Sequence, residues 1–155
     1  MEKSQKIKLS ILIPVRNEEK NIGRMLRVLN SKIVFPMQVL VIYDFPDDDT
    51  IPMVRKLARK YNNIKLVKNK FGKGVANAIR AGIKAAKGDY ILILAADDLG
   101  PVSAILDMTE LMDKGCDFVS CTRYAYGGGR DKDSFAQKIF SGLGNKIFRI
   151  LSGSV

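Results

Sequence analysis

Two adjacent acids, Asp97 and Asp98, directly follow the apolar run YILILAA in this 155-residue chain. Carboxylate oxygens are preferred ligands of Mg²⁺ and Mn²⁺, and one or two of them suffice when phosphates and water complete the shell. The pair therefore predicts a metal site that holds a diphosphate. An Asp after a strand also commonly forms a turn or caps a helix, and the sequence leaves that alternative open.

Other polar residues close further predicted strands. Asp44 closes the second strand, where its carboxylate can accept hydrogen bonds from a nucleobase or a ribose hydroxyl. Glu18 either faces that ligand or is a helix N-terminal acid favoured by the helix dipole. Arg123 and Arg130 are candidates to neutralise a leaving diphosphate, although the glycines before Arg130 also fit a plain loop.

Two loops complete the set of candidates. The tripeptide at 72–74, Gly-Lys-Gly, precedes a predicted helix and allows backbone amides to approach a phosphate, but its spacing matches neither a Walker A loop nor GxGxxG. The acids at 47–49 are expected to form a solvated turn and a helix cap rather than a second metal site. Asn17 is expected to cap the first helix, and Asp49 or Thr50 the second.

The elements that must position these residues alternate between strands and helices. Short apolar runs rich in branched residues predict strands at 9–14, 37–43, 64–67, 90–95 and 117–122. Apolar residues at helical spacing predict helices at 18–30, 50–61, 74–87 and 102–114, the last ended by Gly115. This order predicts an α/β fold with a mostly parallel sheet covered by helices on both faces. Ligands of such sheets bind at the carboxyl ends of the strands, where the polar candidates fall.

The segment at 135–151 has a different pattern. Large apolar residues recur there every fourth position, with lysines and an arginine between them, which predicts an amphipathic basic helix. Such a helix either packs on other protein or lies on an anionic membrane surface.

Composition narrows the classes of function. The net charge of +10 favours anionic partners, but no basic-aromatic pattern supports a nucleic-acid partner, so we expect none. The absence of histidine excludes a Ser-His-Asp triad, and Cys116 and Cys121 alone cannot build a structural zinc site. The two cysteines are expected to be buried thiols in a reducing compartment. No segment approaches the roughly 20 apolar residues of a membrane span, so the expected location is the cytoplasm, with peripheral contact with a membrane.

Five segments in register resemble the family 2 glycosyltransferases, in the branch of the dolichyl-phosphate mannose and glucose synthases. They are IPVRNEE at 13–19, VIYD at 41–44, GKG to KGDY over 72–90, ADDL at 96–99, and CTRY with GGG over 121–129. The resemblance implies a Rossmann-like GT-A domain that binds a nucleotide sugar over 1–133. It also implies the start of an acceptor-facing or membrane-facing region over 134–155, which we expect to be truncated because the family continues further.

The resemblance also implies roles for single residues. The residues that would surround the nucleoside are Pro14, Arg16, Glu18, Ile42 and Asp44. The residues at the DXD position are Ala96, Asp97 and Asp98, of which the two acids would hold Mg²⁺ or Mn²⁺ and the diphosphate, and Arg123 would contact phosphate. Two positions depart from the family. Tyr43 replaces the first acid of its usual DDGS segment, and the first acid of DXD is replaced by Ala96, or by Ala95 if the register is shifted by one.

The expected reaction is metal-dependent transfer of a hexose from a GDP- or UDP-sugar to a polyprenyl or dolichyl phosphate, with the inversion that the resemblance implies. A phosphate acceptor has a second pKa near ~6 and is largely anionic at neutral pH, so it needs no strong general base. One alternative is a domain that binds a nucleotide sugar without turnover. Another is a sugar-phosphate nucleotidyltransferase, although residues 14–18 lack the glycine-rich basic loop typical of that class.

Overall fold

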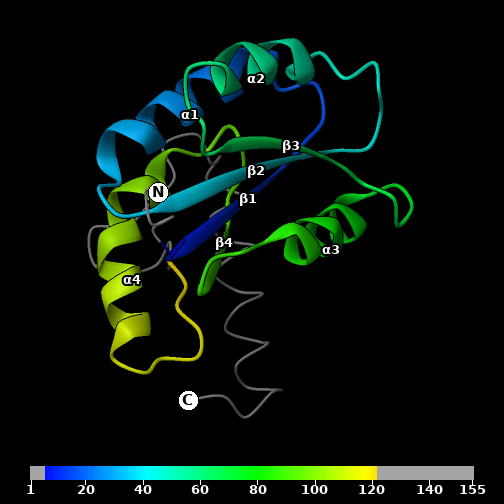
Figure 1. Cartoon of the computed structure of the whole chain (residues 1–155). Helices are drawn as coiled ribbons and strands as arrows, with labels where there is room; N and C mark the ends of the chain where they lie inside the picture. The colour runs from blue at the N-terminus through cyan, green and yellow to red at the C-terminus, as the bar shows by residue number, and fades with distance from the viewer. Residues whose placement is uncertain (1–5, 122–155) are drawn as a thin grey trace, which may run out of the picture. The chain divides into compact units, whose positions relative to one another are not determined.

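The computed structural model describes residues 6–121, and the expected alternation of strands and helices is confirmed there (Figure 1). The elements are β1 (Leu9–Val15), α1 (Glu19–Lys32), β2 (Met37–Tyr43), α2 (Thr50–Ala58), β3 (Ile64–Lys68), α3 (Val75–Ala85), β4 (Tyr90–Ile93), the 3₁₀ helix η1 (Gly100–Ala104) and α4 (Ile105–Asp113). None of the helices within 6–121 is long and apolar enough to cross a membrane.

The four strands form a parallel sheet in the order β3-β2-β1-β4. Three strands end level with one another, because Val15 of β1 lies opposite Tyr43 of β2, which in turn lies opposite Lys68 of β3. The residues that follow these strands therefore emerge at one edge of the sheet, as expected for a parallel arrangement.

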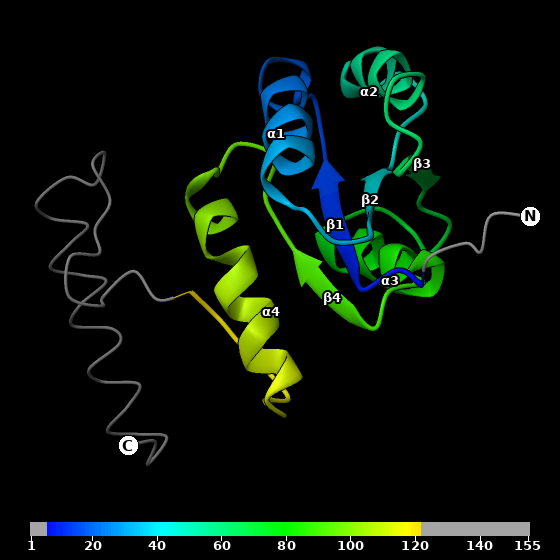
Figure 2. The ribbon, with the colours of Figure 1, turned by 60° about the vertical axis from the view of Figure 1, so that its left-hand side comes forward.

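Alternate residues of the strands enter two separate cores. Ile11 and Ile13 of β1, with Val39 and Val41 of β2, are fully buried on the side covered by α1 and α2. Leu12, Leu40 and Ile42 face the other way and pack against Ala78 and Ala81 of α3. Both views show α3 across the sheet from α1 (Figures 1 and 2), so helices cover both faces as predicted.

Two glycines allow close approach on the α3 side. A Cβ at Gly82 would lie 3.0 Å from Leu12 Cδ1 and 3.0 Å from Ile42 Cδ1, so α3 rests directly on the sheet there. A Cβ at Gly88 would lie 2.7 Å from the backbone nitrogen of Ser10. The amide of Gly88 donates to the Ser10 hydroxyl at 2.8 Å, and this contact positions the start of β4.

Strand β4 is shorter and more exposed than predicted. It ends at Ile93 instead of residue 95, and Ile91 and Ile93 are 44% and 49% exposed. The expectation of a fully covered strand is wrong because α3 packs over β1, β2 and β3, which leaves the α3 side of β4 open within 6–121.

The last described segment also departs from expectation. Residues 117–121 form no strand, and Phe118 is 83% exposed, because no described strand pairs with this segment; Thr122 lies outside the described residues. Cys116 and Cys121 are exposed, so the expectation of buried thiols is wrong. The predicted end of α4 at Gly115 is confirmed, since that glycine has a φ of 96° and its amide bonds the carbonyl of Met112.

Candidate functional site

The start of α1 is held by side chains from the loop after β2. The amides of Asn17, Glu18 and Glu19 donate to Asp48 Oδ1 at 3.2 Å, Thr50 Oγ1 at 2.9 Å and Asp49 Oδ1 at 3.3 Å. These bonds fix the segment that leads into α1, and among the helix's own amides they satisfy that of Glu19. Asp48 is 4% exposed, so the expectation of a solvated turn at 47–49 is wrong for this residue. Asp47 and Asp49 are exposed as expected, and Asp49 is the N-cap residue of α2. Asn17 is not the cap either; it precedes the helix with a φ of 55°.

Asp44 follows β2, and hydrogen bonds engage both of its carboxylate oxygens. The side-chain amide of Asn69 donates to Oδ1 at 2.8 Å, and the backbone amide of Gly74 donates to Oδ2 at 2.8 Å. Asn69 is only 8% exposed and also accepts a bond from the Phe71 amide at 2.9 Å. Asp44 is thus fixed in orientation, and since each carboxylate oxygen has two lone pairs, it can still accept hydrogen bonds from a ligand.

Asn69 was not singled out from the sequence. The signal that could have found it is its place immediately after β3, at the same edge as Asp44. The amide of Gly74 is occupied by Asp44, which corrects the expectation that this amide approaches a phosphate. What the 72–74 loop adds to the site is the Lys73 side chain.

A pocket of about 430 Å³ opens beside Asp44 at this edge. Its lining consists of Pro14, Val15, Arg16, Asp44, Lys73, Gly74, Val75 and Ala78. Three of the predicted nucleoside residues, Pro14, Arg16 and Asp44, are therefore brought together around one cavity, although they come from two different strand ends.

Two cations that line this pocket share one aromatic ring. The Arg16 guanidinium lies 4.5 Å and the Lys73 ammonium 4.8 Å from the centroid of the Phe45 ring. Cation–π contacts of this kind restrain long side chains without neutralising them. The pocket therefore offers two positive charges beside an oriented carboxylate, which suits a ligand that has both hydrogen-bond donors and phosphates.

The remaining predicted residues take other positions. Ile42 is fully buried against α3, so its side chain forms part of the core beneath the pocket. Glu18 precedes α1, and its carboxylate accepts a bond from the Asn21 side chain at 2.7 Å. Ala96 is 4% exposed and packs in the core shared with α1.

Asp97 and Asp98 are both exposed after β4, outside the lining of the pocket. Asp98 Oδ1 accepts a hydrogen bond from the Gly100 amide at 3.0 Å, so Asp98 forms the turn that was the alternative to a metal ligand. Asp97 has no hydrogen bond to another described residue. Within 6–121 no three His, Cys, Asp or Glu side chains cluster as they would in a metal site built from protein ligands alone. Two exposed carboxylates nevertheless fit an ion whose shell is completed by phosphate and water. Arg123, Arg130 and the predicted helix at 135–151 lie outside the described residues.

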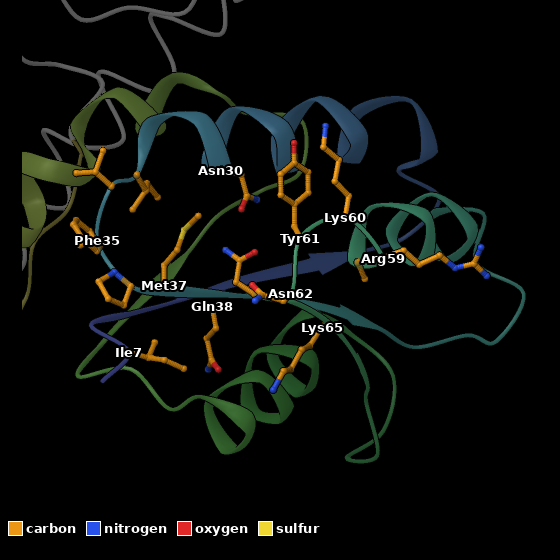
Figure 3. A pocket seen from close by; sticks show the side chains of 15 residues that line it. Ile7, Asn30, Phe35, Met37, Gln38, Arg59, Lys60, Tyr61, Asn62 and Lys65 are labelled. Carbon is orange, nitrogen blue, oxygen red and sulfur yellow. The ribbon is translucent and has the colours of Figure 1, made fainter. Parts of the chain in front are cut away.

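A larger cavity of about 820 Å³ lies at the opposite edge of the sheet (Figure 3). Its lining includes Asn30, Gln38, Tyr61 and Lys65 but no carboxylate. Figure 3 shows the Arg59 side chain pointing away from the other lining residues. Because this cavity has no carboxylate to accept hydrogen bonds from a nucleoside, it is a weaker candidate for a nucleotide site than the pocket beside Asp44.

Comparison with known proteins gives a consistent result. The model of glycosyl transferase family 2 matches residues 10–153, which is most of the chain. A dolichol-phosphate mannosyltransferase of Pyrococcus furiosus is 29% identical over 136 residues, which are 87% of this chain and 38% of that protein. A dolichol-phosphate mannosyltransferase of Saccharomyces cerevisiae is 26% identical over 82% of this chain and 49% of its own length. The chain thus spans less than half the length of these relatives.

Solved structures share the fold. A mannosyltransferase of Pyrobaculum calidifontis, in complex with GDP-Man and Mn²⁺, superposes with a TM-score of 0.62 at 23% identity, over 77% of this chain and 36% of that one. TarS of S. aureus, residues 1–349 in complex with UDP-GlcNAc, gives a TM-score of 0.57 at 24% identity, over 77% of this chain and 39% of that one. At these identities the likeness establishes the architecture, which is that of the GT-A glycosyltransferases.

Proposed function

The chain belongs to glycosyl transferase family 2, and from this premise we propose that it binds a nucleotide-diphosphate sugar beside Asp44 and transfers the hexose to a polyprenyl phosphate. The observation that supports the donor site is the pocket in which an oriented carboxylate stands next to two cations, Arg16 and Lys73. The relatives named for transfer to dolichol phosphate support the acceptor class.

In this proposal the nucleoside lies against Pro14 and donates hydrogen bonds to Asp44. Asn69 and Gly74 keep the carboxylate in place, so it does not need to reorganise when the ligand arrives. Arg16 and Lys73 are the two cations in the pocket lining and would contact the phosphates, and their contact with Phe45 limits the freedom lost on binding.

Asp97 and Asp98 would hold Mg²⁺ or Mn²⁺, and Arg123 would contact the diphosphate. When bound, a divalent ion stabilises negative charge on the leaving diphosphate. Asp97 is exposed, with no hydrogen bond to another residue of 6–121, so its carboxylate is available as a ligand. Asp98 has one oxygen committed to the Gly100 amide and one left.

The acceptor phosphate acts as the nucleophile without an assigned base. Its second pKa near ~6 leaves it largely deprotonated at neutral pH, which suits a chain that has no histidine. Attack from the face opposite the leaving diphosphate inverts the anomeric carbon, in line with the family resemblance.

A second candidate function is binding of a nucleotide sugar without turnover. The observation that favours it is Ala96, which stands where the family has the first acid of DXD and is buried in the core. Both candidates share the donor site, and they differ only in the transfer step.

The donor site is tested by thermal denaturation with GDP- and UDP-sugars, with and without Mn²⁺. A ligand at 100 times its Kd stabilises the folded state by about 2.7 kcal/mol, which raises Tm by several degrees. We expect a metal-dependent rise that is lost in Asp97→Ala or Asp98→Ala and kept in Asp107→Ala, an exposed acid of α4. No shift with any nucleotide sugar overturns the proposal. Transfer of labelled hexose to polyprenyl phosphate then separates the transferase from the binding domain.

A further inference from the structure

Charge is distributed very unevenly along the described chain. Residues 50–88, which span α2, β3 and α3, contain three arginines and eight lysines and no acid. Residues 89–121, which follow them, contain seven acids and one lysine. The α2–β3–α3 part therefore carries most of the positive charge of residues 6–121 and attracts an anionic partner.

The outer face of α3 combines this charge with exposed apolar side chains. Arg80 and Lys84 are exposed, and their charged groups lie 5.0 Å and 5.1 Å from the centroid of the Phe71 ring. Val75 and Ile83 on the same helix are 67% and 49% exposed. A helix that buries small residues inward and shows aliphatic and basic residues outward has the pattern of an interfacial helix.

The position of α3 connects this face to the candidate site. The helix is alone on its side of the sheet among the described elements (Figure 2). Its first turn borders the donor pocket, since Gly74, Val75 and Ala78 belong to the pocket lining. Ile91 and Ile93 of β4 are exposed on this same side, because they lie in register with Ser10 and Leu12. A surface that contacts α3 therefore lies next to the donor site.

We propose that the outer face of α3 docks the protein on an anionic bilayer. Ile83 enters the interface, while Arg80 and Lys84 contact lipid phosphates. Val75 lies at the end of the helix that borders the donor pocket. The inference rests on the proposed function in one respect: a polyprenyl phosphate acceptor resides in such a bilayer, and docking by α3 holds the donor pocket at its surface.

The exposed aliphatic residues favour lipid over nucleic acid as the partner. A bilayer interface offers both phosphates and apolar depth, so it complements Arg80 and Lys84 together with Ile83. A nucleic-acid backbone would leave Ile83 in water, and α3 itself carries no aromatic residue on which a base could stack.

The test is co-sedimentation of the full 155-residue chain with vesicles of phosphatidylcholine, alone or mixed with phosphatidylglycerol. We expect binding only to the mixed vesicles, and weaker binding at high salt. Each basic residue near an anionic surface strengthens binding about fivefold, so Arg80→Gln with Lys84→Gln should weaken it roughly 30-fold. Ile83→Ser should weaken binding without changing the charge.

The matched control is Arg24→Gln with Arg27→Gln. These exposed residues of α1 lie on the opposite side of the sheet, and their replacement removes the same net charge. Thermal unfolding checks that each variant is folded. The inference is overturned if the α3 variants bind like the wild type, if the α1 variant loses as much, or if duplex RNA binds more tightly than mixed vesicles through the same residues.

Failure of this inference and failure of the proposed function are distinguishable. The thermal shift with nucleotide sugars is measured on the same variants without vesicles, and neither Arg80 nor Lys84 lines the donor pocket. Vesicle binding through α3 with no nucleotide shift keeps the inference and removes the transferase. A thermal shift with nucleotide sugars, together with vesicle binding that the α3 substitutions do not change, keeps the donor site and overturns the inference.

Discussion

At the scale of the single residue, the carboxylate of Asp44 depends on Asn69. Asn69 is nearly buried and connects Asp44 with the backbone at Phe71. We predict that Asn69→Ala lowers the free energy of unfolding by about 1–3 kcal/mol, because buried polar groups lose their partner. It should also weaken nucleotide-sugar binding at least ~5-fold, the effect of one misplaced hydrogen bond of about 1 kcal/mol. Urea unfolding and calorimetric titration measure the two effects.

Asn30→Ala is the matched control for this prediction. The Asn30 side chain donates to the Leu26 carbonyl at 2.8 Å, and it lines the cavity at the opposite edge of the sheet. Its loss should reduce stability and leave nucleotide affinity unchanged. Equal affinity losses in both variants would show that Asn69 acts through general stability and not through Asp44.

Single positions also show what sequence reasoning can reach. The position of Asp44 at the site follows from the sequence, because the apolar run at 37–43 predicts a strand that ends just before it and a parallel sheet places the carboxyl ends of its strands at one edge. The burial of Asp48 does not follow, since the bond that it accepts from the Asn17 amide joins two loops about 30 residues apart. Ile42 ends in the core because the pleat turns alternate residues to opposite faces, and that face is set by the packing of α3.

At the scale of the element, the approach of α3 to the sheet depends on Gly82. A Cβ there would meet Leu12 and Ile42 at 3.0 Å, and both side chains are fully buried and cannot yield. We predict that Gly82→Ala lowers the free energy of unfolding by about 1–2 kcal/mol, since overpacking outweighs the gain in helix propensity. Chemical denaturation measures the difference.

Gly23 of α1 provides the matched comparison. A Cβ there would lie 3.3 Å from the sulfur of Met53, the flexible end of a side chain that can move. Gly23→Ala should therefore be neutral or stabilise the protein by up to ~1 kcal/mol, the difference in helix propensity. If both alanines are tolerated equally, α3 is not held at the distance that the structure gives it.

The elements also differ in how far the sequence could predict them. Helices α1 and α3 and strands β1 and β2 have clear periodicity between turn residues, and their patterns located them to within a few residues. The apolar run at 90–95 predicted full burial of β4, but burial depends on whether a helix covers the strand, and α3 packs elsewhere. Residues 117–121 have strand-forming composition but form no strand in the described part of the chain, because strand pairing depends on the neighbouring strand and not on the segment alone.

At the scale of the whole molecule, one surface cluster joins the first and last parts of the described fold. Lys8, just before β1, pairs with Asp113 at the end of α4 at 2.5 Å, and the Tyr90 hydroxyl of β4 donates to the same carboxylate at 2.9 Å. Hydrogen bonds from Lys8 and from Tyr90 hold the pKa of Asp113 below its ordinary value. The hydrogen bond to Asp113 likewise raises the pKa of Lys8.

The sign of each shift defines a pH window for the stability of the fold. The lowered pKa of Asp113 gives stabilisation that is present above its unfolded pKa near ~4 and lost as pH falls through the folded value. The raised pKa of Lys8 gives stabilisation that is present below pH ~10.4 and lost as pH rises through the folded value.

We predict that Asp113→Asn destabilises the protein at pH 7 and that the difference in unfolding free energy from the wild type shrinks below pH ~4. Urea unfolding across this pH range measures the difference. Glu110→Gln is the control, because the described ion pair of Glu110 is with Lys114, four residues further along, and connects no distant part of the fold. A difference between wild type and Asp113→Asn that is constant from neutral to acid pH would mean that the cluster does not connect the two parts of the fold through charge.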